Sequence, residues 1–453
     1  MTTNHIRALC DYIDASPTAY HAVDSAMALL KAHGAVRLYE TDSWELEPGL
    51  LYFVVRDDAA LVAFRTGTSL PAEAGFAIAG AHTDSPGLRA RIEKSVGSRG
   101  MERVAIEVYG GPIHSSWLDR PLSLAGRVVT RMADGSLRVG LVNFDRPVAQ
   151  IPNLAIHFNR EVNKGVEFPV NTAMLPLVGA KGNPVPAIAG STPSAGSTPA
   201  TWVLRALAAE LGVPEADILS AELTFTDAAK SFVFGNDEEI LSAPRIDNLA
   251  GCHAILTAFC AAAPTAHGQL AVLFDNEEIG SGTSRGAASS LLSTIISRIC
   301  IASPGKSSGS QSEDVYRALA RSFQVSVDGA QAWHPGYADK FDEDFAPVLN
   351  GGPAVKANAN VRYATEAIGE AMFKAWCTKA GIPCQRFRMR ADLAPGSTIG
   401  PVSSALLGVR TVDVGMPMLA MHSARETAGA LDHDMMIAVL GTFYVSGPEV
   451  PTP

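Results

Sequence analysis

The sequence predicts an α/β protein in which helices sandwich a mixed, largely parallel sheet, with a β-rich domain inserted into it. From residue 241 onward, helical stretches alternate with apolar runs of strand length, as in layered α/β folds. Between residues 94 and 236, short runs of alternating polarity are separated by turn signals instead. We therefore expect one domain formed by residues 1–93 and 237–453, interrupted by a second domain at 94–236.

The first 93 residues predict a helical start, a hairpin and one buried strand. Apolar residues recur at helical spacing from 4 to 33, and Gly34 offers a stop. Residues 51–54 and 61–64 predict a hairpin, because the two apolar runs flank a short polar turn. The apolar run 75–80 ends in AHTDSPG, which indicates a buried strand with polar residues at its carboxyl end.

The remaining elements follow from the same periodicities. In the inserted domain, strands are expected at 104–109, 124–130 and 137–141 and a helix at 201–211. Residues 187–201 repeat GSTP in a tract of small and polar residues, which we expect to form a loop without chemistry of its own. In the last part, helices are expected at 249–262, 313–321, 366–380 and 435–445, and strands at 270–274, 324–327 and 409–414.

Composition limits the class of protein. With 453 residues, 47% of them hydrophobic and 18% charged, the chain can form two globular domains. The net charge of −10 argues against nucleic acid as a partner. Apolar segments stay far short of the ~20 residues of a membrane span, and charges interrupt the start of the chain before a signal peptide can form. Six cysteines without a CxxC pair indicate buried free thiols, so we expect a cytoplasmic protein without a membrane partner.

Seven polar residues stand out by their position. Six of them closely follow apolar runs, and the seventh, Asp247, stands where a helix begins. Because parallel strands end at one edge of a sheet, we expect these side chains to gather there. The seven residues are His82, Asp84, Asp247, Glu277, Glu278, Asp328 and His422.

Imidazoles and carboxylates without a thiolate suit a divalent ion such as zinc, manganese or cobalt. Two ions about 3.5–4 Å apart need a shared ligand with two oxygens, and Asp247 is our choice for it. Glu277 and Glu278 repel each other unless a cation intervenes, so one can bind metal while the other takes a proton from water. Asp84 can accept the proton of the second ring nitrogen of His82. Taken singly, His82 can also be a loop histidine and Asp247 a helix N-cap.

Seven segments contain motifs that run through almost the whole chain. They are AGAHTDSPGLR at 79–89, IPNLAIHFNR at 151–160, RIDNLAG at 245–251, DNEEIGSGTSRGA at 275–287, HPGYADK at 334–340, GGPAVKANANVRYA at 351–364 and DVGMPMLAMHSARETAG at 413–429. Together these motifs resemble the aspartyl aminopeptidase family of dinuclear zinc metallopeptidases, and chance agreement at so many ordered positions is negligible.

The resemblance implies a catalytic domain, an inserted dimerisation domain and a homododecamer built from dimers. It implies an enzyme that removes N-terminal residues, acidic ones (Asp or Glu) by preference, from peptides with a free N-terminus. It also implies two divalent ions in each subunit, with Glu277 as the general base. One ion would be held by His82, Asp247 and Asp328, and the other by Asp247, Glu278 and His422.

Two further residues would bind substrate by the same resemblance. His157, in IPNLAIHF, matches a histidine that reaches the active site of a neighbouring subunit. Lys356, in GGPAVKANAN, matches a lysine near the pocket for the substrate's side chain. Without the resemblance, the ordinary explanation of His157 is a packed strand histidine and that of Lys356 is an exposed lysine.

Three alternatives stay open. The aminopeptidase could have a broader or neutral specificity, or the site could serve another dinuclear hydrolase such as a carboxypeptidase or an amide deacylase. The chain could also be a catalytically silent assembly or cargo protein. The silent protein is expected to lack one or more of the proposed ligands or the base, and all of them are present.

Overall fold

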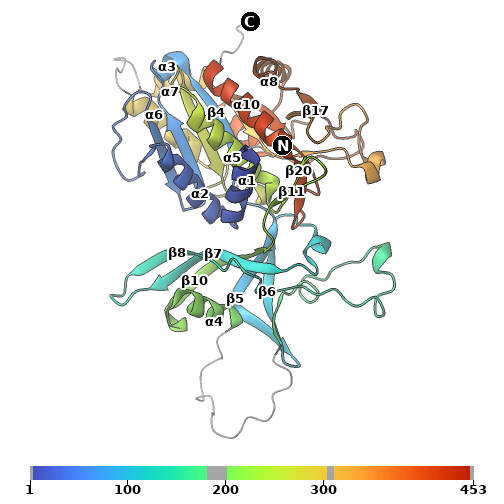
Figure 1. Ribbon diagram of the computed structural model, residues 1–453. Helices are drawn as coiled ribbons and strands as arrows, with labels where there is room; N and C mark the ends of the chain where they lie inside the picture. Colours follow the sequence, from blue (N-terminus) through green and yellow to red (C-terminus); the bar gives the residue numbers. More distant parts are fainter. Residues whose placement is uncertain (1–3, 181–200, 304–310, 449–453) are drawn as a thin grey trace. The chain divides into compact units, whose positions relative to one another are not determined.

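The computed structural model describes residues 4–180, 201–303 and 311–448, which form two compact units (Figure 1). The first unit comprises Met1–Ser85, Ser231–Met421 and Glu426–Pro453, and the second comprises Pro86–Lys230 and His422–Arg425. The limits of 94 and 236 set for the inserted domain stay a prediction. The GSTP repeats lie outside the described residues.

The first unit is built on a nine-stranded mixed sheet with the order β1-β2-β3-β13-β4-β14-β18-β16-β17. Its four central strands, β13, β4, β14 and β18, are parallel, while β3 and β16 run antiparallel to their neighbours β13 and β18. The largely parallel sheet expected from the sequence is confirmed. The strands are β1 (Val36–Arg37), β2 (Leu51–Arg56), β3 (Ala60–Arg65), β4 (Phe76–His82), β13 (Gly268–Phe274), β14 (Phe323–Val327), β16 (Ala354–Lys356), β17 (Gln385–Phe387) and β18 (Arg410–Gly415).

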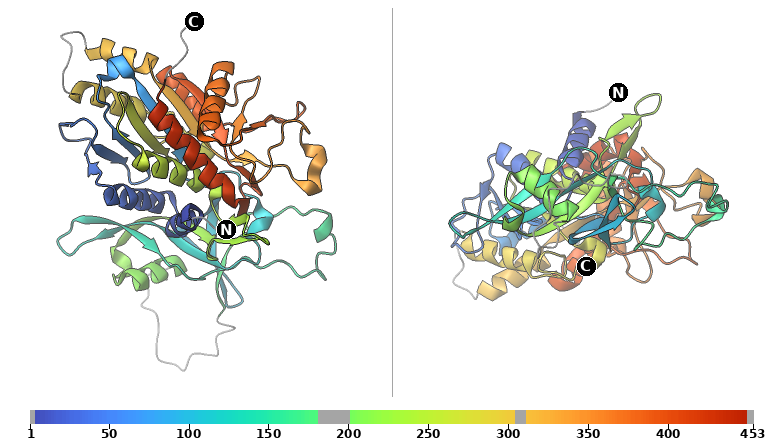
Figure 2. Two further views of the ribbon diagram at one scale, coloured as in Figure 1. Left: turned by 45° about the horizontal axis from the view of Figure 1, so that its top comes forward. Right: turned by 90° about the horizontal axis from the view of Figure 1, so that it is seen from below.

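Helices cover both faces of this sheet, because its strands are apolar on both sides. In β4, Ala77 and Ala79 pack into one core, and Phe76 and Ile78 into the other. Figure 2 shows these layers from two further directions, with α10 in red. One face is covered by α1 (Asn4–Ala15), α2 (Ala19–Ala32), α5 (Ile246–Ala261), α8 (Ala367–Ala380) and α10 (Ala430–Ser446), and the other by α6 (Leu291–Ala302), α7 (Gln311–Ala320) and α9 (Ile399–Leu407).

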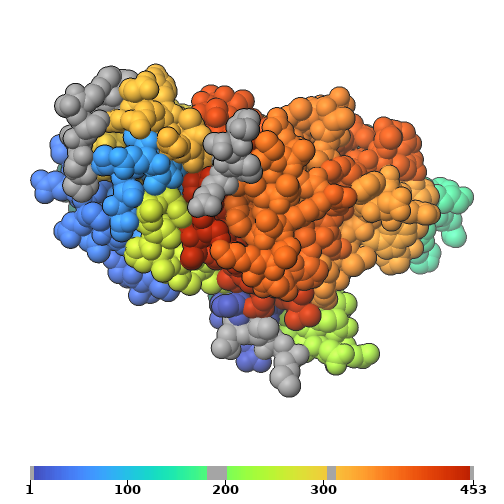
Figure 3. Space-filling model, turned by 90° about the horizontal axis from the view of Figure 1, so that it is seen from above, coloured from blue at the N-terminus to red at the C-terminus, as the bar shows by residue number. Residues whose placement is uncertain are grey.

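Segments from the two ends of the sequence share the surface of this unit. Figure 3 shows blue residues from the start of the chain on the same face as yellow to red residues from its second half. The short helix α3 (Pro71–Ala74) packs against α7 on this unit. The first 85 residues therefore do not form this unit alone, because segments from the later part of the chain complete it.

A smaller five-stranded sheet in the first unit was not predicted from the sequence. Its order is β11-β12-β20-β19-β15, and its strands have only two to four residues, too few for a clear periodic signal. It places β15, which begins two residues after Asp328, beside β19, in parallel. The strands are β11 (Phe232–Phe234), β12 (Ile240–Ala243), β15 (Ala330–Gln331), β19 (Pro417–Leu419) and β20 (Glu426–Gly429).

Two other expectations need correction. The helical stretch from 4 to 33 is two helices, α1 and α2, because Pro17 cannot continue a helix after α1 ends at Ala15. The cysteines are not joined in disulfides, but only Cys252 and Cys377 are buried, and the other four are partly exposed. Among the described helices, none combines the length and apolarity that a bilayer crossing requires.

The second unit is rich in β-structure. Its six-stranded antiparallel sheet has the order β8-β7-β10-β5-β6-β9, and α4 (Trp202–Leu211) packs on one face through Val203 and Leu207. Thr201 caps this helix by accepting a hydrogen bond from the backbone N–H of Leu204. The strands are β5 (Gly87–Ser98), β6 (Met101–Tyr109), β7 (Leu122–Arg131), β8 (Leu137–Asn143), β9 (Leu177–Ala180) and β10 (Ile218–Asp227).

Candidate metal centre

Three neighbouring parallel strands deliver polar residues to one edge of the large sheet. His82 is the last residue of β4 and pairs in register with Phe274, the last residue of β13. Glu277 and Glu278 follow β13 in the short 3-10 helix η4 (Glu277–Ile279), and Asp328 directly follows β14. Asp247 reaches the same place from the start of α5, where its backbone is still extended, with φ −78° and ψ 106°.

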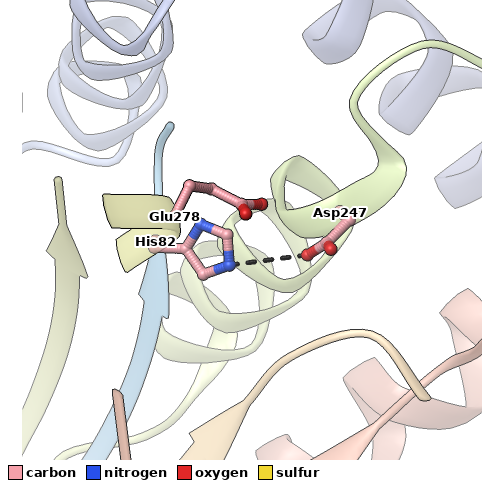
Figure 4. A group of neighbouring side chains, drawn as sticks. All are labelled: His82, Asp247 and Glu278. Atoms are coloured by element: carbon pink, nitrogen blue, oxygen red, sulfur yellow. Dashed lines mark ion pairs between the residues drawn. The ribbon is translucent and has the colours of Figure 1, made fainter. Parts of the chain in front are cut away.

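The side chains of these residues converge. His82 Nε2 lies 3.4 Å from Asp247 Oδ1 and 3.4 Å from Asp328 Oδ1. Ligand atoms of His82, Asp247 and Glu278 all lie within 4.8 Å of one another. Figure 4 shows these three side chains pointing toward one another from β4, α5 and η4. His82 and Asp247 are buried, and Glu278 is partly exposed.

The charges around His82 test whether the cluster suits a metal ion. Burial disfavours the imidazolium, but hydrogen bonds with Asp247, Asp328 and Asp84 raise the pKa of His82 well above its usual range. The surrounding carboxylates therefore favour a positive charge at this ring. A bound cation would supply that charge in place of the proton and leave the imidazole neutral. A neutral imidazole with several carboxylates is a donor set that zinc accepts, so the residues fit a divalent ion.

Asp84 connects three members of the site. Its Oδ1 accepts a hydrogen bond from the backbone N–H of Glu277 and its Oδ2 one from that of Glu278, each at 3.1 Å. His82 Nδ1 lies 3.0 Å from the carbonyl oxygen of Asp84 and 3.4 Å from Oδ1. The nearer partner of the imidazole is thus the carbonyl, and the carboxylate fixes the turn that carries both glutamates.

Asp247 is fixed through its backbone. Its N–H donates to Glu426 Oε2 at 3.0 Å, and its carbonyl oxygen accepts from Ser85 Oγ at 2.8 Å. Asn248, the next residue, donates from Nδ2 to the carbonyl of Val327 at 2.8 Å. Sequence reasoning missed Glu426, although it lies in the segment HSARETAG that carries part of the resemblance.

Glu277 has the properties of a proton acceptor. Burial, together with the charges of Asp328, Asp247 and Asp84 and against the opposing effect of His82, raises the pKa of Glu277 to about 7. A carboxylate with such a pKa can take up and release a proton near neutral pH.

Lys356 lies in the same cluster, with only 2% of its surface exposed. Its Nζ donates to Asp328 Oδ2 at 3.2 Å and to the carbonyl oxygen of Gly329 at 2.9 Å. The structure thus places this lysine against a proposed metal ligand.

The two remaining residues belong to the second unit. His422 Nδ1 lies 3.2 Å from the carbonyl oxygen of Gly111, and the backbone of His422 is left-handed, with φ 69°. His157 is exposed on a segment between β8 and β9. The metal-binding role of His422 and the substrate-binding role of His157 stay predictions.

Carboxylates and an imidazole that converge on one point can hold a divalent ion, and an acid of raised pKa beside them can accept a proton from water, which is the chemistry that metal-dependent hydrolases use. Comparisons with known proteins agree, because the family model for the aminopeptidase I zinc metalloproteases (M18) matches residues 12–444. The chain belongs to this family. It is a metal-dependent aminopeptidase. The family predicted from the sequence motifs is confirmed, because M18 includes aspartyl aminopeptidase.

The similarity extends over nearly the whole chain. This chain is 40% identical over 445 residues to the probable M18 family aminopeptidase 2 of Pseudomonas aeruginosa, and the match covers 98% of this chain and 99% of that protein. It is 34% identical to a chain in the cryo-EM structure of the Ape4 and Nbr1 complex, with a TM-score of 0.91 over 97% of this chain and 85% of that one. The S. cerevisiae mApe1 dodecamer is 25% identical, with a TM-score of 0.83 over 97% and 96%.

Proposed function

We propose that this aminopeptidase uses two divalent ions, zinc in preference to manganese or cobalt, to remove N-terminal residues from peptides. The observation that carries the proposal is the convergence of His82 Nε2 with oxygens of Asp247 and Asp328 at 3.4 Å, beside Glu278. His82, Asp247 and Asp328 would hold one ion. Asp247, Glu278 and His422 would hold the other.

When bound, the two ions would polarise the scissile carbonyl group and would lower the pKa of water toward ~7. Glu277 then acts as the base: its carboxylate accepts the proton of the attacking water and passes it to the leaving amine nitrogen. Asp84 keeps Glu277 in place through the backbone N–H bond. Burial of His82, Asp247 and Asp328 limits the contact of these side chains with bulk water.

Glu277→Gln tests this assignment. The amide cannot accept the proton, so we expect kcat to fall by about 10²–10⁴-fold while zinc binding is kept. Metal content and kcat are measured on the same purified protein. The matched control is Glu366→Gln, which makes the same change at an exposed position and should behave as wild type. Near-normal turnover in Glu277→Gln would remove this residue from the mechanism.

We also propose a preference for acidic N-terminal residues, which rests on the resemblance to aspartyl aminopeptidases. Rates for reporters with Asp, Glu and Leu at the N-terminus test it. Equal rates would favour an enzyme of broader or neutral specificity. A protein inactive on all reporters after chelation and re-addition of single metals would be the silent assembly protein.

We further propose a homododecamer built from dimers, in the cytoplasm, with residues 94–236 as the dimerisation domain. The similarity to the mApe1 dodecamer supports the assembly. Leu154, Ile156 and Phe158 flank His157 and expose 60%, 51% and 80% of their surface, as expected of a segment that a second subunit covers. The free cysteines agree with a reducing compartment.

A further inference from the structure

Lys356 ends β16 and is surrounded by acidic groups. It stands directly opposite Asp413 of the neighbouring strand β18. Its Nζ reaches Asp328 Oδ2 and the Gly329 carbonyl, and lies 5.2 Å from the centre of the Tyr363 ring. With 2% exposure, the side chain has almost no surface left for a substrate.

The amino group of the lysine finds its acceptors inside the protein. A buried ammonium group needs acceptors for its three N–H donors, and two of them have partners within 3.2 Å. The ammonium is thus committed to groups of the protein itself.

The two oxygens of Asp328 have different partners. Oδ1 accepts the backbone N–H of Gly329 at 2.7 Å and lies 3.4 Å from His82 Nε2. Oδ2 is held by Lys356 at 3.2 Å. Because a carboxylate can rotate about its last bond, a strong donor at one oxygen determines where the other oxygen points.

We propose that Lys356 is a positioning residue that holds Oδ2 of Asp328 so that Oδ1 faces the metal site, and that it acts on metal binding and not on the side chain of the substrate. The inference rests on the proposed function, in which Asp328 is a ligand. If Lys356 acts on metal binding, its loss should lower the hydrolysis rates of all substrates in the same proportion, whatever their N-terminal residue. The predicted contact of Lys356 with an acidic substrate is the competing assignment.

Lys356→Met in the full-length protein tests the inference, because methionine keeps much of the volume and loses the charge and the donors. Loss of a group that orients a metal ligand should weaken zinc binding by about 10–100-fold, measured by competition with a chromophoric chelator. The kcat values for Asp-, Glu- and Leu-terminal reporters should fall in the same proportion. Lys374→Met is the matched control, since Lys374 pairs at 2.6 Å with Glu370, which is not a proposed ligand, and should leave zinc affinity unchanged.

A double-mutant cycle shows whether the lysine acts through Asp328. In the Asp328→Asn background, Lys356→Met should cause no further loss of zinc affinity. If Lys356→Met is insoluble, Lys356→Gln, which keeps a donor, is measured in the same way and should show a smaller loss.

Two results would overturn the inference. One is wild-type zinc affinity in soluble Lys356→Met or Lys356→Gln protein. The other is a loss confined to Asp- and Glu-terminal reporters, which would place the lysine at the substrate. Failure of the proposed function is a separate result, because the wild-type protein would then bind no zinc or hydrolyse no reporter.

Discussion

At the scale of single residues, the site depends on side chains that hold other side chains. Asp84 accepts two backbone N–H groups and thereby fixes the turn with the proposed base and a proposed ligand. Glu426 holds the backbone of Asp247 in a similar way. Such supporting residues decide whether the reacting groups keep their geometry, because each ligand has several rotamers of comparable energy.

Asp84→Asn should disturb this support. An amide has one acceptor oxygen, and its NH₂ group would face one of the two N–H donors now bound by the carboxylate. We expect zinc affinity or kcat/KM to fall by about 10–100-fold, as for other groups behind metal ligands. Chelator competition and steady-state kinetics measure both quantities. The same change at the exposed Asp24 is the control, and wild-type values for Asp84→Asn would show that the turn needs no such anchor.

At the scale of elements, the end of β18 passes close to the segment that carries Asp328. A Cβ atom on Gly415 would lie 2.1 Å from the carbonyl oxygen of Asp328 and 2.9 Å from the backbone nitrogen of Ala330. Both contacts are with backbone, which cannot rotate away as a side chain can. Only glycine therefore allows β18 and the Asp328 segment to approach this closely.

Gly415→Ala should force the two segments apart. We expect a loss of about 1–3 kcal/mol in the free energy of unfolding, as for other overpacked sites, together with weaker zinc binding. Urea unfolding and chelator competition measure the two effects. Gly441→Ala in α10 is the control: a Cβ there meets no atom within 4 Å, and alanine should stabilise the helix by up to ~1 kcal/mol. Equal stability of Gly415→Ala and wild type would contradict the packing argument.

At the scale of the whole molecule, several histidines are buried away from the candidate metal centre. Burial is the main cause that lowers the pKa of His21 and of His253 to about 4, and that of His433 well below its usual range. His253 Nδ1 lies 2.8 Å from His433 Nε2, so α5 and α10 are joined by a hydrogen bond between two imidazoles. In the unfolded chain, histidines bind protons below pH ~6.5.

The sign of the pH effect follows from this difference. The stability from neutral buried histidines is fully present above pH ~6.5 and is lost as the pH falls toward 4, at about 1.4 kcal/mol for each unit of pKa difference. Asp432, whose pKa burial raises to about 7, has the opposite effect: the stability that its neutral form contributes is lost as the pH rises above ~3.9, the value of an aspartate in the unfolded chain.

His21→Gln isolates one of these groups. Wild type should lose unfolding free energy faster than His21→Gln between pH 6.5 and 4 in urea titrations at constant zinc and protein concentration. Loss of metal in acid affects both proteins alike, so the difference reports on His21. Parallel curves for the two proteins would show that this histidine does not contribute.

Much of this protein follows from its sequence alone. Hydrophobic periodicity is local, so it located the hairpin β2–β3, the strands β4, β13, β14 and β18 and most of the helices. Polar residues at the ends of parallel strands must meet at one edge of the sheet. The positions of the strands in the sequence therefore also predicted that His82, Glu277, Glu278 and Asp328 lie close together.

The tertiary structure decided how these residues are supported. Lys356 and Asp328 are separated by 28 positions, Asp247 and Glu426 by 179, and Asp84 and Glu277 by 193. No local pattern encodes such pairs, because they depend on strand order and register in the sheet. The sequence by itself determined the class of fold and the chemistry of the proposed site, whereas only packing decided that Lys356 is buried against Asp328, a proposed metal ligand.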